Sequence, residues 1–159
     1  MWRIVLWLLA AALMGSTAQA EGTGAIPRYA SFDNAKVYLR EGPSYSHRIL
    51  WVYHRKGLPV KIVAQYDVWR RIEDAGGGVG WVHASMLSDA RTVIVTTAKP
   101  AAIREDDDSS SKILALAQPG VIAKLEACRA MACEIATDGI DGWIDKKNIW
   151  GVNTSESFR

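Results

Sequence analysis

Histidine and cysteine are both scarce in this sequence of 159 residues, and they lie on opposite sides of residue 90. The three histidines are His47, His54 and His83, whereas the two cysteines are Cys128 and Cys133. An enzyme site needs a nucleophile with its base, paired carboxylates or a metal cluster. The part of the chain that holds both cysteines contains no imidazole, so we expect no catalytic activity, no metal centre and no cofactor.

Two local patterns are alternatives to this expectation. Ser85 lies two residues after His83, but a serine and histidine pair also requires an orienting acid and an oxyanion site. The acidic run at 105–108 contains carboxylates, but calcium needs oxygen ligands in a defined loop order. We interpret the first pattern as coincidence and the second as solvated surface.

A basic stripe is also missing. Nineteen lysines and arginines are mixed along the chain with seventeen aspartates and glutamates. Proteins that bind nucleic acid usually concentrate basic side chains on one surface. We therefore expect no nucleic-acid partner.

No apolar run reaches the roughly 20 residues that a membrane-spanning helix needs. The apolar run at 4–13 follows the short basic start at 1–3, and Ala18-Gln19-Ala20 has the small-x-small form of a signal-peptidase site. We predict a cleaved signal peptide at 1–20 without a lipoprotein cysteine. The alternative is an uncleaved anchor. Cleavage predicts a periplasmic or secreted protein with no stable membrane insertion.

The sequence contains an internal repeat, in which a unit of about sixty residues occurs twice. Gly80-Trp81-Val82 returns as Gly142-Trp143-Ile144, and Leu39-Arg40-Glu41 returns as Ile103-Arg104-Glu105. Further pairs, in the same order, are Arg48-Ile49-Leu50 with Lys112-Ile113-Leu114 and the glycine turns at 56–60 and 119–122. The order and the similar spacing predict a tandem duplication.

Short alternating segments separated by turn residues favour an all-β fold of two small barrels or sandwiches. In the first unit we predict strands at 36–40, 49–53, 60–64, 69–73 and 79–82. Units of this size are marginal alone, so we expect the two to pack against each other. The predicted organisation is a flexible lead at 21–28, the first domain at 29–90, a connecting strand at 91–97, the second domain at 98–152 and a polar tail at 153–159.

The repeated glycine and tryptophan have a structural interpretation. An indole buries a large apolar area, and a glycine beside it lets neighbouring backbone approach closely. We expect Gly80, Trp81, Gly142 and Trp143 to organise the two cores. Because an indole is rarely buried completely, one edge of either ring remains an alternative floor for a binding groove.

The two cysteines flank a predicted turn, and the segments on either side of it are typical of a β-hairpin. In an exported protein an even pair at this spacing favours a disulfide over a catalytic thiol or a metal site. We predict a bond between Cys128 and Cys133.

The ordered motifs resemble the bacterial SH3-like domain, in particular the variant found in exported proteins of proteobacteria. The first unit carries the resemblance through Leu39 to Ser44, Ile49 to Val52, Lys56 to Val60, Trp69 to Ile72 and Gly80 to Ser85. The second unit carries it through Ile103-Arg104, Pro119-Gly120, Leu125 to Cys128, Cys133 to Ile135 and Gly142 to Ile144. The resemblance implies two SH3-like barrels of five or six strands each, a location in the cell envelope and a binding role.

Bacterial SH3-like domains often bind cell-wall peptide or dock other proteins. Aromatic residues crowd the first unit beyond what a small core can hide, and exposed rings beside charged groups suit a short peptide. We predict a non-catalytic module that recognises cell-wall peptide through an aromatic groove; the alternative is protein docking without wall affinity. The predicted ligand-binding residues are Arg40, Tyr45, Trp51, Tyr53, Trp69 and Arg70.

Two departures distinguish the second unit. It has acids where the first unit has Gly42-Pro43, and Cys133 where the first unit has Trp69. We therefore expect the units to bind different ligands. An alternative for Trp51 and for Tyr53 is that they pack against the second unit instead of binding a ligand.

Overall fold

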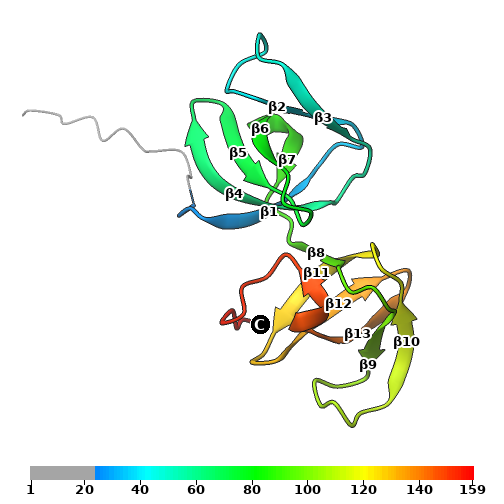
Figure 1. The fold of residues 1–159 in the computed structure, drawn as a ribbon. Helices are drawn as coiled ribbons and strands as arrows, with labels where there is room; N and C mark the ends of the chain where they lie inside the picture. Colours follow the sequence, from blue (N-terminus) through cyan, green and yellow to red (C-terminus); the bar gives the residue numbers. More distant parts are fainter. Residues whose placement is uncertain (1–23) are drawn as a thin grey trace, which may run out of the picture.

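The computed structural model describes residues 24–159, so the predicted signal peptide and its cleavage site lie outside the described residues. The described chain is all-β, with two seven-stranded antiparallel sheets joined end to end along the sequence. Each sheet curls around its own core, and the two units lie one above the other with β8 at the junction (Figure 1). Within the described residues, no helix is long and apolar enough to cross a membrane.

The first unit has the strand order β3-β2-β6-β5-β4-β1-β7. A 3-10 helix, η1 (Ala84–Met86), precedes its last strand. The strands are β1 (Arg28–Phe32), β2 (Val37–Arg40), β3 (Ile49–Tyr53), β4 (Pro59–Tyr66), β5 (Trp69–Glu73), β6 (Val79–His83) and β7 (Leu87–Ser88).

The second unit repeats this order as β10-β9-β13-β12-β11-β8-β14, again with a 3-10 helix, η2 (Lys146–Asn148), before the last strand. Each sheet has seven strands instead of the expected five or six, because the two-residue β7 and β14 each extend a sheet edge. The strands are β8 (Thr92–Val95), β9 (Ala101–Arg104), β10 (Ile113–Ala117), β11 (Ile122–Cys128), β12 (Ala132–Thr137), β13 (Ile140–Asp145) and β14 (Ile149–Trp150).

The segment assigned by sequence to the connection contains β8. This strand pairs with β11 and β14, so it is part of the second sheet. It has the place that β1 has in the first sheet, where β1 pairs with β4 and β7. The structural repeat therefore begins at β1 and at β8.

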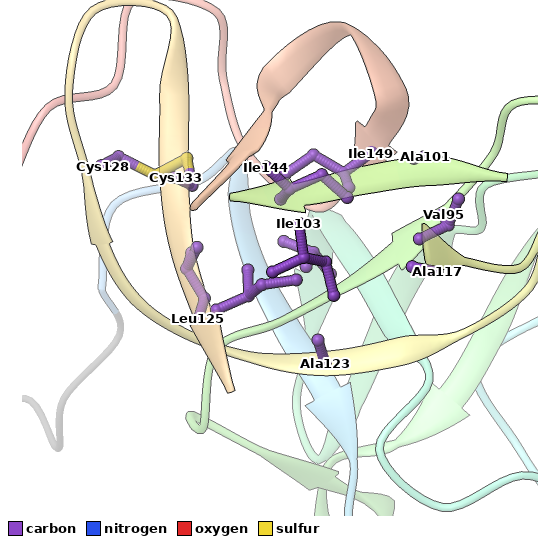
Figure 2. Packing of buried hydrophobic residues seen from close by; sticks show 12 residues of the cluster. Val95, Ala101, Ile103, Ala117, Ala123, Leu125, Cys128, Cys133, Ile144 and Ile149 are labelled. Atoms are coloured by element: carbon purple, nitrogen blue, oxygen red, sulfur yellow. A yellow bond between two sulfur atoms is a disulfide. The ribbon is translucent and has the colours of Figure 1, made fainter. Parts of the chain in front are cut away.

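Alternation along the strands builds both cores, because successive side chains of a strand point to opposite faces of the sheet. In β8, Val93 and Val95 are buried while their neighbours are half-buried. Figure 2 shows Val95, Ile103, Leu125, Ile144 and Ile149 of the second unit pointing into one cluster. The first unit has its own cluster, formed by Ala30, Phe32, Val37, Leu39, Tyr53, Val60, Ile62, Ile72 and Val82.

The two units touch at their junction through apolar and polar contacts. The ring of Tyr29 meets Trp150 edge-on at a centroid distance of 5.2 Å. The Thr92 hydroxyl donates to the Gly57 carbonyl at 2.7 Å, and Arg55 donates to the Gly120 carbonyl at 2.8 Å. The alternative that Trp51 and Tyr53 pack against the second unit is wrong, because Trp51 is 62% exposed and Tyr53 lies in the core of the first unit.

The predicted disulfide is confirmed. Cys128 and Cys133 stand opposite each other in the β11–β12 hairpin and are bonded. Both are buried at the edge of the second core, where Figure 2 shows the sulfur bridge. The bond therefore closes a short hairpin loop of the second unit.

Reduction of this disulfide should lower the free energy of unfolding by about 2 kcal/mol, because a closed loop of this size restricts the unfolded chain. Urea denaturation with and without dithiothreitol measures the change. A variant with both cysteines changed to alanine should unfold at the same urea concentration with and without the reductant. An unchanged midpoint on reduction of the native protein would contradict the prediction.

Candidate functional site

The loop at 41–48 joins β2 to β3 and is fixed by Arg40. The guanidinium of Arg40 donates to the carbonyls of Tyr45 and His47 at 3.0 and 2.9 Å. A β-carbon at Gly42 would overlap the His47 ring, so a larger residue there would require this ring to move. The base of the loop closes through the Glu41 amide, which donates to the Arg48 carbonyl at 3.0 Å.

This loop places Tyr45 over two further rings of the first unit. Tyr45 meets Trp69 edge-on at 5.0 Å between centroids and stacks on His83 at 5.9 Å. Trp69 and His83 are cross-strand partners on β5 and β6, and their centroids lie 5.5 Å apart. We call Tyr45, Trp69 and His83 the ring cluster.

One ring of the cluster is exposed to solvent, and another is buried beneath it. Tyr45 is 69% exposed, whereas Trp69 is only 6% exposed. The Arg40 guanidinium lies 5.4 Å from the centre of the Tyr45 ring, within range of a cation–π interaction. The cluster therefore presents a fixed aromatic ring with an adjacent positive charge to solvent.

Arg40, Tyr45 and Trp69 are the predicted ligand-binding residues that the fold brings together. Trp51 is 62% exposed on the edge strand β3, opposite Leu39, and no close contact joins its ring to the cluster. Arg70 donates to the carbonyls of Asp67 and Trp69 and so stabilises the β4–β5 turn. Both bonds come from Nη1 of its guanidinium.

Tyr53 belongs to the core, which corrects its assignment to a ligand surface. Its side chain packs against Phe32, and the residue is 8% exposed. Its hydroxyl donates to the Asp74 carboxylate at 2.6 Å. Burial, with a further contribution from this hydrogen bond, raises the pKa of Tyr53 above its ordinary value.

His83 is a member of the cluster that sequence reasoning did not assign to binding. Its Nδ1 lies 2.7 Å from the Ser85 hydroxyl and accepts the Ser85 amide at 3.2 Å. This arrangement caps η1. The signal available in the sequence was the antiparallel register, because pairing Arg71 with Trp81 also pairs Trp69 with His83.

Gly80 and Gly142 each lie where one strand crosses another at close range. A β-carbon at Gly80 would stand 2.7 Å from Cγ of Leu39 and 2.8 Å from the Arg40 carbonyl. A β-carbon at Gly142 would stand 2.6 Å from the Arg104 carbonyl. These distances are too short for any real side chain, which accounts for the repeated glycine.

The repeated tryptophans occupy equivalent positions in the two units but differ in their exposure to solvent and in the side chains around them. Trp81 is half-buried and lies between Arg40 and Arg71 on the neighbouring strands. Trp143 is buried under Arg129, whose guanidinium lies 4.5 Å from the ring centre. Neither ring belongs to the main core of its unit, and Trp143 packs with Ala127 and Ala132 in a small separate cluster, so the expectation that the two tryptophans organise the cores is wrong.

The shared register aligns the units residue by residue. Trp81 pairs with Arg71, and Trp143 pairs with Glu134, so Trp69 corresponds to Ala132. The sequence comparison that matched Trp69 with Cys133 was wrong by one residue. Likewise His83 corresponds to Asp145, because these residues pair with Trp69 and Ala132.

The loop at 105–112 corresponds to the loop at 41–48. The Glu105 amide closes it on the Lys112 carbonyl, and Arg104 donates to the Ser111 carbonyl. These bonds repeat those of Arg40 and of Glu41, so Ser109 takes the place of Tyr45. The second unit therefore has no ring at any of the three cluster positions.

Comparison with known proteins supports the fold and the duplication. A sequence model described as the bacterial SH3 domain matches residues 33–89 and 97–151. No curated protein matches the chain. Two solved structures from Trichomonas vaginalis are similar at low scores. NlpC2 has a TM-score of 0.36 at 12% identity over 78% of this chain, and NlpC1 has a TM-score of 0.36 at 12% identity over 82%. The chain covers 48% of each of those proteins. The two family matches together span more than half of the sequence, and the chain belongs to the bacterial SH3 domain family, in two consecutive copies.

Proposed function

We propose that this protein is a non-catalytic binding module of the cell envelope whose first unit recognises cell-wall peptide. The observation that carries the proposal is the ring cluster. Tyr45 is largely exposed, yet Trp69, His83 and Arg40 hold it in one orientation. A ring that is ordered before binding loses little conformational entropy when a ligand covers it.

The neighbourhood of Tyr45 suits a short peptide with a carboxylate. The flat face of the ring offers apolar contact, and Arg40 supplies positive charge beside it, whereas Arg48 is paired with Glu41. Trp51 on the edge strand is a further exposed ring in the same unit. The family's general role in binding, together with the disulfide, fits a protein exported to the periplasm or beyond the cell.

Co-sedimentation with purified cell-wall sacculi tests this function. We expect native protein to pellet, and Tyr45→Ala to reduce retention about tenfold, because central aromatic contacts commonly dominate binding. Trp51→Ala should give a smaller loss. Leu116→Ala removes an exposed apolar side chain of the second unit and should retain native binding. Native protein that stays in the supernatant would reject the wall ligand.

Docking of another envelope protein is the second candidate. The edge strands β3 and β10 end their sheets, and both expose apolar side chains. These are Ile49, Leu50 and Trp51 in the first unit, and Ile113, Leu114 and Leu116 in the second. An exposed strand edge can pair with an extended segment of a partner. Crosslinking to one envelope protein without retention on sacculi would favour this function.

A further inference from the structure

The second unit is hollow where the first unit holds its ring cluster. Ser109, Ala132 and Asp145 stand at the places of Tyr45, Trp69 and His83. Ser109 and Asp145 line a cavity of about 460 Å³ between the loop at 105–112 and the turn of the β11–β12 hairpin, and Ala132 is buried nearby. Ligand pockets in proteins commonly enclose about 300–1,000 Å³.

The walls of this cavity are largely apolar. Ala130 and Met131 come from the hairpin turn, and Met131 is 75% exposed. Lys146 also lines the cavity, and its ammonium group donates to the carbonyls of Thr154 and Glu156. Thioether and methylene groups make favourable contacts with aromatic rings.

The rim of the cavity carries charges of both signs, and the loop beside it is acidic. Asp107 and Asp145 line the cavity together with Lys146 and Lys147, and the two acids are paired with Arg129 and Lys147. Along the same loop, Glu105, Asp106 and Asp108 have no ion-pair partner among the residues that the structure describes. These three carboxylates lie on the loop that borders the cavity and do not line it themselves.

We propose that this cavity, formed by the loss of the ring cluster, binds an aromatic side chain carried by a basic segment of a partner protein. The first unit shows that this part of the fold accepts rings, since three of them pack there. The acidic loop supplies the charge that favours lysine or arginine beside the ring. The site is separate from the Tyr45 surface and does not depend on the wall-binding function.

The test uses the ε-methyl resonance of Met131 in the full protein, with Met86 of the first unit as internal reference. The probe is acetyl-lysyl-tyrosyl-lysine amide, titrated to millimolar concentration. We expect a saturable upfield shift of Met131 from the tyrosine ring and no shift of Met86. The alanine analogue should give no such shift, and the analogue with glutamates in place of lysines should bind at least about tenfold more weakly.

Two variants test whether the peptide binds in this cavity. Ser109→Tyr returns a ring to the cavity from an exposed loop position and should weaken peptide binding about tenfold or more. Ser110→Tyr adds the same ring one residue away and should stay within about twofold of native affinity. Tyr45→Ala, which removes the exposed ring of the first unit, should leave the Met131 titration unchanged.

Three results would overturn the proposal. One is the absence of a saturable shift of Met131 with the tyrosine peptide. Another is equal weakening by Ser109→Tyr and Ser110→Tyr. The last is a Met131 shift that grows with protein concentration without peptide, which would identify a second copy of the chain as the occupant.

Discussion

Gly142→Ala should lower the free energy of unfolding by about 3 kcal/mol, and Gly80→Ala should have an effect of similar size. The added methyl group would overlap the Arg104 carbonyl and Cγ2 of Ile103 in the second unit. In the first unit it would overlap Leu39 and the Arg40 carbonyl. Strand backbone cannot move away without breaking the ladder that it belongs to, so the overlap persists as strain.

Gly76→Ala is the matched control for both variants. A β-carbon there would lie 3.4 Å from the nearest atom, an Asp74 carboxylate oxygen, at an ordinary contact distance. Its stability should stay within about 1 kcal/mol of native, the usual range for a tolerated surface change. Urea denaturation followed by tryptophan fluorescence measures all three. Equal midpoints for Gly142→Ala and Gly76→Ala would contradict the packing argument.

Glu156→Gln should give the second large loss, about 2 kcal/mol at neutral pH, because it breaks charged hydrogen bonds in a half-buried site. Glu156 accepts from Arg91 at 2.8 and 3.2 Å and from the backbone N–H of Asn153 at 3.0 Å. Lys146 bonds the Glu156 carbonyl, and Phe158 forms a bridge with Cys128. The segment predicted as a polar tail is therefore bonded to the second unit.

The same site gives stability a defined pH dependence. Burial would raise the pKa of Glu156, but the hydrogen bonds from Arg91 and from the Asn153 amide outweigh it, and the pKa lies below its ordinary value. A carboxyl with a lowered folded-state pKa stabilises the fold above its unfolded pKa. That contribution disappears as the pH falls through the folded value. Glu156→Gln should flatten this acid limb of the stability profile.

Glu126→Gln is the control for this measurement. Glu126 pairs with Lys124 at 2.8 Å, but both side chains are exposed, and such pairs contribute about 0–1 kcal/mol. Its acid profile should match that of the native protein. An identical profile for Glu156→Gln would show that the contacts of Glu156 do not stabilise the fold.

The sequence determined the duplication, the all-β class and the disulfide. These properties follow from local pattern: alternation of apolar residues, glycines at turns and the short spacing of the cysteines. The repeated Gly-Trp pair located the strand crossings, because Gly80 and Gly142 serve one steric need in both units. Such features depend on neighbours in the chain or on a motif that recurs.

Only the tertiary structure decided which side chains meet. Tyr53 and Trp51 lie two residues apart on β3, yet one is buried on Phe32 and the other is exposed at a sheet edge. His83 joins Tyr45 and Trp69 because loop closure and cross-strand register bring together residues distant in sequence. The cavity at Ser109 likewise could not be predicted from the sequence, because it is recognised only when the strand register aligns Trp69 with Ala132. Strand pairing sets these contacts, and a shift of one residue in register exchanges the two faces of a strand.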